Sequence, residues 1–189
     1  PLPPLHTSIV GRTVHYLPET ESTNTLALEA CKDGGVFIAE QQTAGRGRHG
    51  REWHSAPGLG LWFSVCLESP IDGINYAAAL AVRDVLSDYA GISVRWPNDL
   101  YIGQKKVCGI LVEQRNGWFA LGIGINVNHQ ALDFPAMLRH RAGSLAMSTG
   151  IHLNRRDLFT RLLERLDVAV LQIRSGVSSN LREDWICAC

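Results

Sequence analysis

The sequence predicts an α/β (α+β) fold, in which helices flank a mixed and largely antiparallel sheet. Apolar residues recur at helical spacing over residues 74–89 and again over residues 154–173. Residues 61–67 form a nearly continuous apolar run, which is typical of a strand at the centre of a sheet. From residue 93 onward the pattern changes to strands separated by tight turns, so antiparallel pairing is expected there.

The first part of the chain predicts a helix between two strands. Residues 13–16 have the pattern of a short strand, and residues 36–41 have that of a second strand. Between them, residues 21–24 supply side chains that cap helices, and Gly34 marks the stop of the helix that follows. The second strand then leads into a glycine-rich loop.

The rest of the chain predicts two helices around a three-stranded meander. The helix over residues 74–89 is ended by Gly91, and Asn154 caps a last helix that runs to about residue 173. Asn116-Gly117 is a strong hairpin signal between two of the strands. The strands of the meander are expected at residues 100–102, 107–114 and 118–127.

The composition indicates a single globular domain. The 18 basic and 18 acidic side chains of the 189 residues cancel, so no overall positive field would hold nucleic acid. A hydrophobic content of 46% with 19% charged residues fits a soluble protein, and no apolar run approaches the roughly 20 residues that cross a bilayer. The N-terminal residues lack the pattern of a secretory signal, so a cytoplasmic protein is expected.

The cysteines and histidines show no pattern of a disulfide framework or a metal site. The five cysteines form an odd set without a C-x-x-C spacing, as expected of reduced thiols. Cys187 and Cys189 lack the second pair that a zinc site would need. The seven histidines are scattered singly, and each is expected at the surface or in a hydrogen bond.

Residues 43–55, TAGRGRHGREWHS, combine glycines with basic side chains. Gly45, Gly47 and Gly50 spell the dinucleotide fingerprint, but the residues that follow make a poor helix start. The P-loop spacing fails as well, because Arg51-Glu52 stands where a lysine and a hydroxyl are required. The loop is either a cradle for an anion, built from backbone N–H and guanidinium groups, or an ordinary solvated basic turn.

Three further stretches place polar groups or glycines where a strand pattern alone would not. Residues 95–99, RWPND, present an aromatic ring, an amide and a carboxylate around a proline. Lys106 stands at the start of a strand, and residues 122–128, GIGINVN, carry glycines at period two, which leave one strand face bare. The alternatives are a solvated turn lysine for Lys106 and an Asx-turn carboxylate for Asp99.

Together these stretches describe a site with several cations and one carboxylate. Arg46, Arg48 and Lys106 supply the cations, and Asp99 supplies the carboxylate. The sequence shows no Ser-His-Asp or Cys-His pattern that would indicate a covalent nucleophile. Cations without a nucleophile favour chemistry on phosphate, where positioning and charge neutralisation do most of the work.

Several short motifs also occur in a fixed order along the chain. They are Ser22-Thr23-Asn24, residues 42–51 (QTAGRGRHGR), Arg95-Trp96-Pro97-Asn98-Asp99, residues 106–113 (KVCGILVE) and Gly122-Ile123-Gly124-Ile125-Asn126. In this order they resemble the motifs of biotin–protein ligases, from about residue 13 to residue 185. The fold of that family is a mixed sheet flanked by helices, related to lipoate ligases and to class II aminoacyl-tRNA synthetases.

The resemblance implies a two-step reaction. The carboxylate of biotin attacks the α-phosphate of ATP to give biotinyl-5′-AMP and pyrophosphate, and a lysine of a biotin carboxyl carrier domain then attacks this mixed anhydride. Both nucleophiles come from the substrates, in agreement with the site described above. Magnesium is expected with ATP as co-substrate, with no metal ligands from the chain and no tightly bound prosthetic group.

The resemblance also implies residue roles. Lys106, Arg48 and Asp99 would be catalytic, with Lys106 stabilising charge at the reacting carboxylate and phosphate. Biotin would be bound by Ser22, Thr23, Asn24, Gln42, Arg46, Gly47, Arg48 and Lys106. The nucleotide would be bound by Arg46, Arg48, Arg51, Trp53, Asn98, Lys106 and Asn126.

The same resemblance divides the chain into a lead-in at residues 1–12, a catalytic domain at residues 13–185 and, at residues 186–189, the start of a small β-barrel domain that is otherwise missing. Arg95 stands where the family usually has lysine, which keeps the charge and changes its geometry. No helix-turn-helix precedes residue 13, so a repressor role is not supported. The expected partners are biotin, ATP and a carrier domain, and a homodimer is also considered.

Three alternatives stay open. A lipoate or octanoate ligase or transferase would keep the fold and change the acyl substrate, and competition between biotin and lipoate would separate the two. A non-catalytic module would bind biotin or the adenylate without releasing pyrophosphate. A P-loop or Rossmann nucleotide protein is disfavoured by the residues after Gly50.

Overall fold

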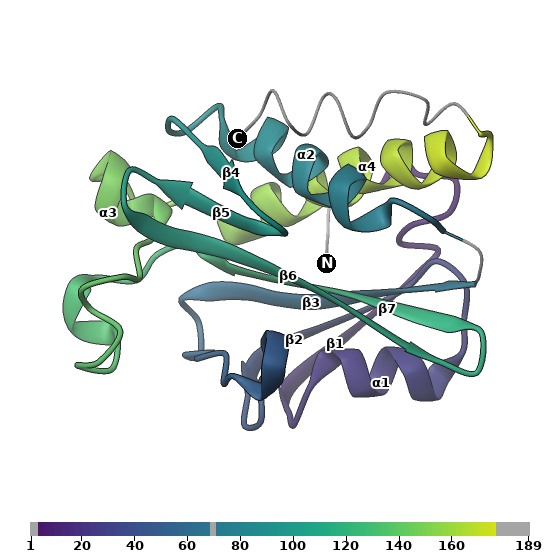
Figure 1. The fold of residues 1–189 in the computed structure, drawn as a ribbon, viewed down its shortest axis with the longest axis horizontal. Coiled ribbons are helices and arrows are strands. Elements are labelled where there is room, and N and C mark those ends of the chain that lie inside the picture. Colours follow the sequence, from purple (N-terminus) through teal and green to yellow (C-terminus); the bar gives the residue numbers. More distant parts are fainter. Residues whose placement is uncertain (1–3, 69–70, 177–189) are drawn as a thin grey trace.

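The computed structural model describes residues 4–68 and 71–176 of the chain. In this part of the chain, seven strands form one sheet in the order β1-β2-β3-β7-β6-β5-β4 (Figure 1). β1 and β2 are parallel, and every other neighbouring pair is antiparallel, which confirms the predicted mixed sheet. The strands are β1 (Thr13–Thr20), β2 (Gly35–Gln42), β3 (Gly60–Glu68), β4 (Ser93–Arg95), β5 (Asp99–Ile102), β6 (Lys105–Arg115) and β7 (Trp118–Asn126).

Helix α1 (Thr23–Ala30) connects the parallel strands β1 and β2. Parallel neighbours need such a crossover, because a tight turn reverses the direction of the chain. Ala27 and Leu28 on the helix pack against Phe37 and Cys66 on the sheet. This packing places the first turn of α1 beside the end of β2, where the glycine-rich loop begins.

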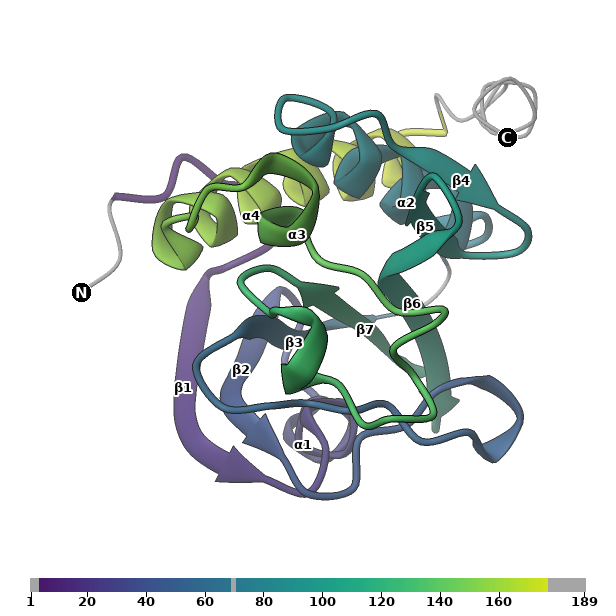
Figure 2. The ribbon, with the colours of Figure 1, turned by 90° about the vertical axis from the view of Figure 1, so that its left-hand side faces the viewer.

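Helices α2 (Ile74–Leu86) and α4 (Arg155–Arg174) cover the face of the sheet opposite α1 (Figure 1 and Figure 2). Their apolar sides and the strands beneath them form the main core, which includes the buried side chains of Phe63, Leu121 and Leu162. Because the core fills this face, the polar residues of the predicted site lie on the face that carries α1.

Most of the predicted elements are confirmed, with shifted ends. Asn116 and Gly117 both have positive φ, 51° and 80°, as a type I′ hairpin turn requires. The side chain of Asn154 caps α4 by accepting hydrogen bonds from two backbone N–H groups of its first turn. The first strand extends to Thr20, because it pairs with β2 beyond its apolar part, and the helix predicted to reach residue 89 ends at Leu86.

The structure adds elements that the sequence pattern did not predict. Helix α3 (Leu145–Thr149) and the 3₁₀ turns η1 (Arg48–Gly50) and η2 (Ala131–Asp133) are too short to show a helical period. Within the described part of the chain, every helix is too short or too polar to cross a membrane. The expected start of a β-barrel at residues 186–189, with Cys187 and Cys189, lies outside the described residues.

Candidate active site

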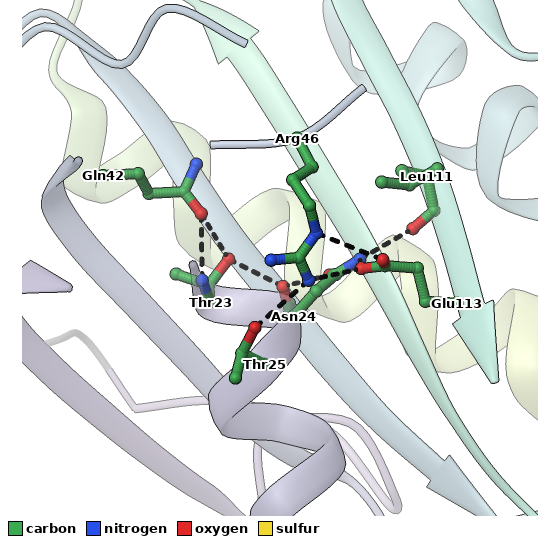
Figure 3. A network of polar contacts seen from close by, with 8 residues as sticks. Thr23, Asn24, Thr25, Gln42, Arg46, Leu111 and Glu113 are labelled. Carbon is green, nitrogen blue, oxygen red and sulfur yellow. Dashed lines mark hydrogen bonds and ion pairs between the residues drawn. The ribbon is translucent and has the colours of Figure 1, made fainter. Parts of the chain in front are cut away.

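A network of polar side chains lies at the first turn of α1 (Figure 3). Gln42 accepts hydrogen bonds at Oε1 from the backbone N and the Oγ1 of Thr23, at 2.9 and 3.1 Å. The Oγ1 of Thr23 also lies 2.7 Å from the Oγ of Ser64 on β3, and Ser64 donates to the Oδ1 of Asn24 at 2.6 Å. The structure therefore brings three of the predicted biotin-binding residues together, and it adds Ser64, which sequence reasoning missed.

Ser22 lies just before this turn, and its side chain does not cap the helix as expected. It occupies the N-cap position, but its side chain makes no capping hydrogen bond. The Oε1 of Gln42 accepts from the N–H of Thr23, the first residue of the helix, so β2 supplies the cap. The prediction that residues 21–24 cap the helix is therefore wrong for the side chain of Ser22.

The glycine-rich loop folds back on itself. The N–H of Gly47 donates to the carbonyl of Arg51 at 2.7 Å, and the N–H of Trp53 donates to the carbonyl of Gly45 at 2.9 Å. A Cβ at Gly45 would lie 2.6 Å from the carbonyl oxygen of Trp53, so the close return of the chain requires glycine at this position. The two halves of the loop therefore lie close together, and a solvated basic turn would not require this close approach.

The three arginines of the loop lie in different surroundings. Arg46 forms an ion pair with Glu113 on β6, with NH2 and Oε2 3.0 Å apart. The guanidinium carbon of Arg48 lies 5.8 Å from the centroid of a ring of Trp96, within the range of a cation–π contact. Arg51 is exposed. Arg46 therefore connects the loop to β6, and Arg48 connects it to the turn between β4 and β5.

Paired glycines form a flat floor within the site. Gly109 on β6 lies opposite Gly124 on β7. A Cβ at Gly124 would be 2.6 Å from the indole of Trp53, and one at Gly109 would be 2.8 Å from the same ring, so the indole lies on this floor. A Cβ at Gly122 would be 2.3 Å from the Oδ1 of Asn24. The bare strand face is confirmed, and side chains of the protein itself lie on it.

Lys106 and Asp99 form an ion pair beside this floor. The Nζ of Lys106 lies 2.6 Å from the Oδ1 of Asp99, and the two side chains are 28% and 29% exposed. The same Nζ lies 5.3 Å from the centroid of a Trp53 ring. The N–H of Lys106 donates to the carbonyl of Arg141 at 2.8 Å, which fixes the backbone as well. Lys106 is therefore a positioned cation and not a solvated turn lysine.

Two of the predicted nucleotide-binding residues are buried asparagines. The Nδ2 of Asn98 donates to the carbonyl of Ile110, and the Nδ2 of Asn126 donates to the carbonyl of Gly143 at 2.9 Å. The Oδ1 of Asn98 is buried and has no hydrogen-bond partner among the described residues. Both side chains thus tie loops to strands, and their role toward a nucleotide stays a prediction.

Glu113 is a residue of the site to which the sequence assigned no role. It accepts hydrogen bonds from Arg46 on the loop and from the Nδ2 of Asn24 on α1. Glu113 follows Gly109 and Leu111 at period two on β6, and alternate residues of a strand share one face. This alternation could have placed Glu113 on the face of the glycine floor.

His129 contradicts the prediction that each histidine lies at the surface or in a hydrogen bond. Its side chain is fully buried, and neither ring nitrogen has a hydrogen-bond partner among the described residues. The ring stacks on Phe134 at a centroid distance of 4.7 Å and meets the edge of Trp62 at 5.8 Å. Burial lowers the pKa of His129 to about 4, because the charged ring would lose its hydration.

This burial predicts that acid destabilises the protein. Between the ordinary pKa of 6.5 and the folded pKa of about 4, the unfolded chain binds a proton that the folded chain does not. The contribution of the neutral His129 ring to the free energy of unfolding is therefore complete above pH 6.5 and is lost as the pH falls toward 4. From pH 7 to pH 5, this group should lower the free energy of unfolding by about 2 kcal/mol.

The variant His129→Phe should lack this part of the decline, because its ring can still stack on Phe134 and carries no titrating group. Urea unfolding of both proteins at pH 7 and pH 5 measures the difference. Parallel losses of unfolding free energy in the two proteins would contradict the assignment.

A model of the Biotin/lipoate A/B protein ligase family matches residues 16–129, more than half of the chain. The chain belongs to this family. The segment that matches the ligase family contains the α1 network, the glycine-rich loop, the Lys106–Asp99 pair and the glycine floor.

Curated relatives in this ligase family are similar over most of the chain. The bifunctional ligase/repressor BirA of Bacillus subtilis is 37% identical over 175 residues, which cover 84% of this chain and 54% of that protein. The biotin–[acetyl-CoA-carboxylase] ligase of Mycobacterium tuberculosis is 33% identical over 182 residues, which cover 87% and 66% of the two chains. The chain thus spans about half the length of the first relative.

A solved structure of the family has the same fold. The biotin protein ligase of Aquifex aeolicus, in complex with biotin and ATP, has a TM-score of 0.83 and 30% sequence identity to this chain. The match covers 92% of this chain and 77% of that one. The expected mixed sheet with flanking helices is therefore that of a known biotin protein ligase.

Proposed function

We propose that the chain acts as an ATP-dependent biotin–protein ligase, which forms biotinyl-5′-AMP and passes biotin to a lysine of a carrier domain. The observation that carries the proposal is that the hydrogen-bonding network of α1 and the Lys106–Asp99 pair lie on one face of a glycine-floored sheet. Biotin has a polar ring system at one end and a carboxylate at the other, so it needs both kinds of group. The Aquifex aeolicus relative that holds biotin and ATP supports this choice of substrates.

In the first step, a carboxylate oxygen of biotin bonds to the α-phosphorus of ATP while the bond to pyrophosphate breaks. The ammonium of Lys106 stabilises the negative charge that develops on the reacting groups. Asp99, 2.6 Å away, fixes the position of that ammonium, so little rearrangement is needed as charge develops. Arg48 would add a second positive charge from the loop.

Magnesium belongs to this step as part of the MgATP substrate. Among residues 4–68 and 71–176, no group of three or more His, Cys, Asp or Glu side chains is placed to hold a metal ion. The phosphates of ATP would therefore supply most of the ligands, which is how Mg²⁺ is commonly bound with nucleotides.

In the second step, the amine of the carrier lysine attacks the carbonyl carbon of the mixed anhydride, and AMP leaves. The cations of the site neutralise negative charge on the substrates, and its amides and hydroxyls position them. The remaining assignments are part of the proposal: biotin is bound by Ser22, Thr23, Asn24, Gln42, Arg46, Gly47 and Arg48, and the nucleotide by Arg51, Trp53, Asn98 and Asn126. The carrier domain, a homodimer and a cytoplasmic location stay predictions.

Pyrophosphate release tests the proposal directly. The chain is incubated with MgATP and biotin, and in parallel with lipoate or octanoate, because the family includes lipoate enzymes. Release with biotin and not with the other acids is the expected result. Release with lipoate or octanoate alone would favour the acyl alternative, and biotin binding without any release would indicate a binding module.

A further inference from the structure

We propose that Glu113 is a positioning residue, which holds the glycine-rich loop in place through Arg46. The effect of Glu113 on biotin binding rests on the proposed function, whereas its effect on the position of the loop can be tested without any ligand. Glu113 lies on β6, 67 residues along the chain from Arg46, so the pair joins distant segments. The pair therefore attaches the loop to strand β6 of the sheet.

The geometry of the pair is bidentate. The Oε1 of Glu113 accepts from the Nε of Arg46 at 3.2 Å, and its Oε2 accepts from the NH2 of Arg46 at 3.0 Å. The NH2 also donates to the Oγ1 of Thr25 on α1 at 3.1 Å. Paired N–H···O bonds to a carboxylate restrict the orientation of a guanidinium group more than a single contact does. The loop, α1 and β6 are thus joined at one point.

These contacts leave one side of the guanidinium group available. Nε and NH2 are engaged, and NH1 has no hydrogen-bond partner among the described residues. Figure 3 shows this nitrogen pointing away from Glu113, toward the side of Gln42 and Thr23. Glu113 therefore orients two N–H donors of Arg46 toward the polar network in which a ligand is proposed to bind.

The same carboxylate also holds part of that network. The Nδ2 of Asn24 donates to the Oε2 of Glu113 at 2.7 Å and contacts the carbonyl of Leu111 at 3.3 Å. The Oδ1 of Asn24 in turn accepts from Ser64. Loss of the negative charge at position 113 would therefore release the loop and loosen Asn24 together.

The tip of the loop, residues 46–51, has few other contacts with the rest of the protein. Among the described residues, every hydrogen bond from this tip to a residue outside the loop comes from Arg46. The ring contact between Arg48 and Trp96 is a second, weaker connection. A loop tip with so few connections opens readily once its main contact is lost.

Limited proteolysis with trypsin reports on this opening, because residues 46–51 contain three arginines. The variant Glu113→Gln keeps the shape of the side chain and removes its charge. Cleavage after Arg46, Arg48 or Arg51 should become about 10-fold faster, since a hydrogen bond to a charged group contributes enough to change the open population by that factor. Cleavage at the wild-type rate would overturn the proposal.

The pair between Asp33 and Arg174 provides a matched control. Asp33 accepts from NH1 and NH2 of Arg174 at 2.8 and 2.6 Å, and the Arg174 and Asp33 side chains are 27% and 22% exposed. Asp33→Asn removes a comparable bidentate pair at the opposite end of β2. It should lower the thermal stability without changing cleavage of the loop, and faster loop cleavage in this variant would show that general destabilisation explains the effect.

Biotin binding gives the second measurement. In Glu113→Gln the dissociation constant for biotin should rise about 10-fold, and biotinyl-5′-AMP should escape faster, because Arg46 is no longer oriented. Asp33→Asn should bind biotin like the wild type. If the wild type binds no biotin and releases no pyrophosphate, the proposed function fails, and loop cleavage still decides the role of Glu113.

Thr25→Val keeps the inference testable if Glu113→Gln does not fold. Valine has the shape of threonine and lacks the Oγ1 that accepts from the NH2 of Arg46. The loop of this variant should be cleaved faster than that of the wild type, by a smaller factor than in Glu113→Gln. Wild-type cleavage in Thr25→Val would count against the proposed attachment of the loop.

Discussion

Replacing Lys106 with alanine is expected to slow pyrophosphate release about 10²- to 10³-fold, the usual effect of removing a group that stabilises charge in the transition state. The Nζ of Lys106 is fixed by Asp99 at 2.6 Å and lies over the ring of Trp53, so the charge is placed before the reaction begins. Biotin binding should weaken much less, because the interaction strengthens as charge develops. Single-turnover pyrophosphate release and equilibrium biotin binding separate the two effects.

Lys105→Ala is the matched control for this prediction. Lys105 is the neighbouring lysine, and its Nζ donates to the carbonyl of Arg139 at 2.7 Å instead of pairing with Asp99. Its removal should leave pyrophosphate release near the wild-type rate. Equal losses in biotin affinity and in the rate of release for Lys106→Ala would show that the lysine acts in ground-state binding, and the catalytic assignment would then be wrong.

The fold was largely predictable because its elements carry periodic patterns. The apolar run at residues 61–67 became β3, an interior strand of the sheet, and the hairpin at Asn116-Gly117 joins β6 and β7 as expected. The short elements were missed, because one turn of helix, as in α3, shows no period. Fold class therefore follows from local patterns, which a single sequence contains.

The site was predictable only in part, because much of it depends on contacts between distant segments. The pairing of Gly109 with Gly124 follows from strand register, which the residues of either strand alone do not specify. The same holds for the placement of Trp53 on that pair and for the contact between Arg46 and Glu113. Burial of His129 was missed because an isolated histidine carries no pattern that distinguishes a core position from a surface one.

Gly122→Ala is expected to disrupt the polar network and to reduce biotin affinity more than tenfold, which corresponds to at least about 1.4 kcal/mol. The new Cβ would lie 2.3 Å from the Oδ1 of Asn24 and 2.9 Å from its Cγ. Asn24 is buried and held by Ser64 and Glu113, so its side chain has little freedom to move away. Overpacking of this kind should also lower the free energy of unfolding by about 1–3 kcal/mol.

A double-mutant cycle with Asn24→Ala tests whether this clash is the cause. The β7 backbone at Gly122 has no positive φ and would accept alanine, so removal of the Asn24 side chain should relieve most of the destabilisation. Gly91→Ala, where a new Cβ meets no atom within 4 Å, is the control for glycine replacement itself. If Gly122→Ala and Asn24→Ala lower the free energy of unfolding additively, the two side chains do not compete for this space, and the loss of binding needs another cause.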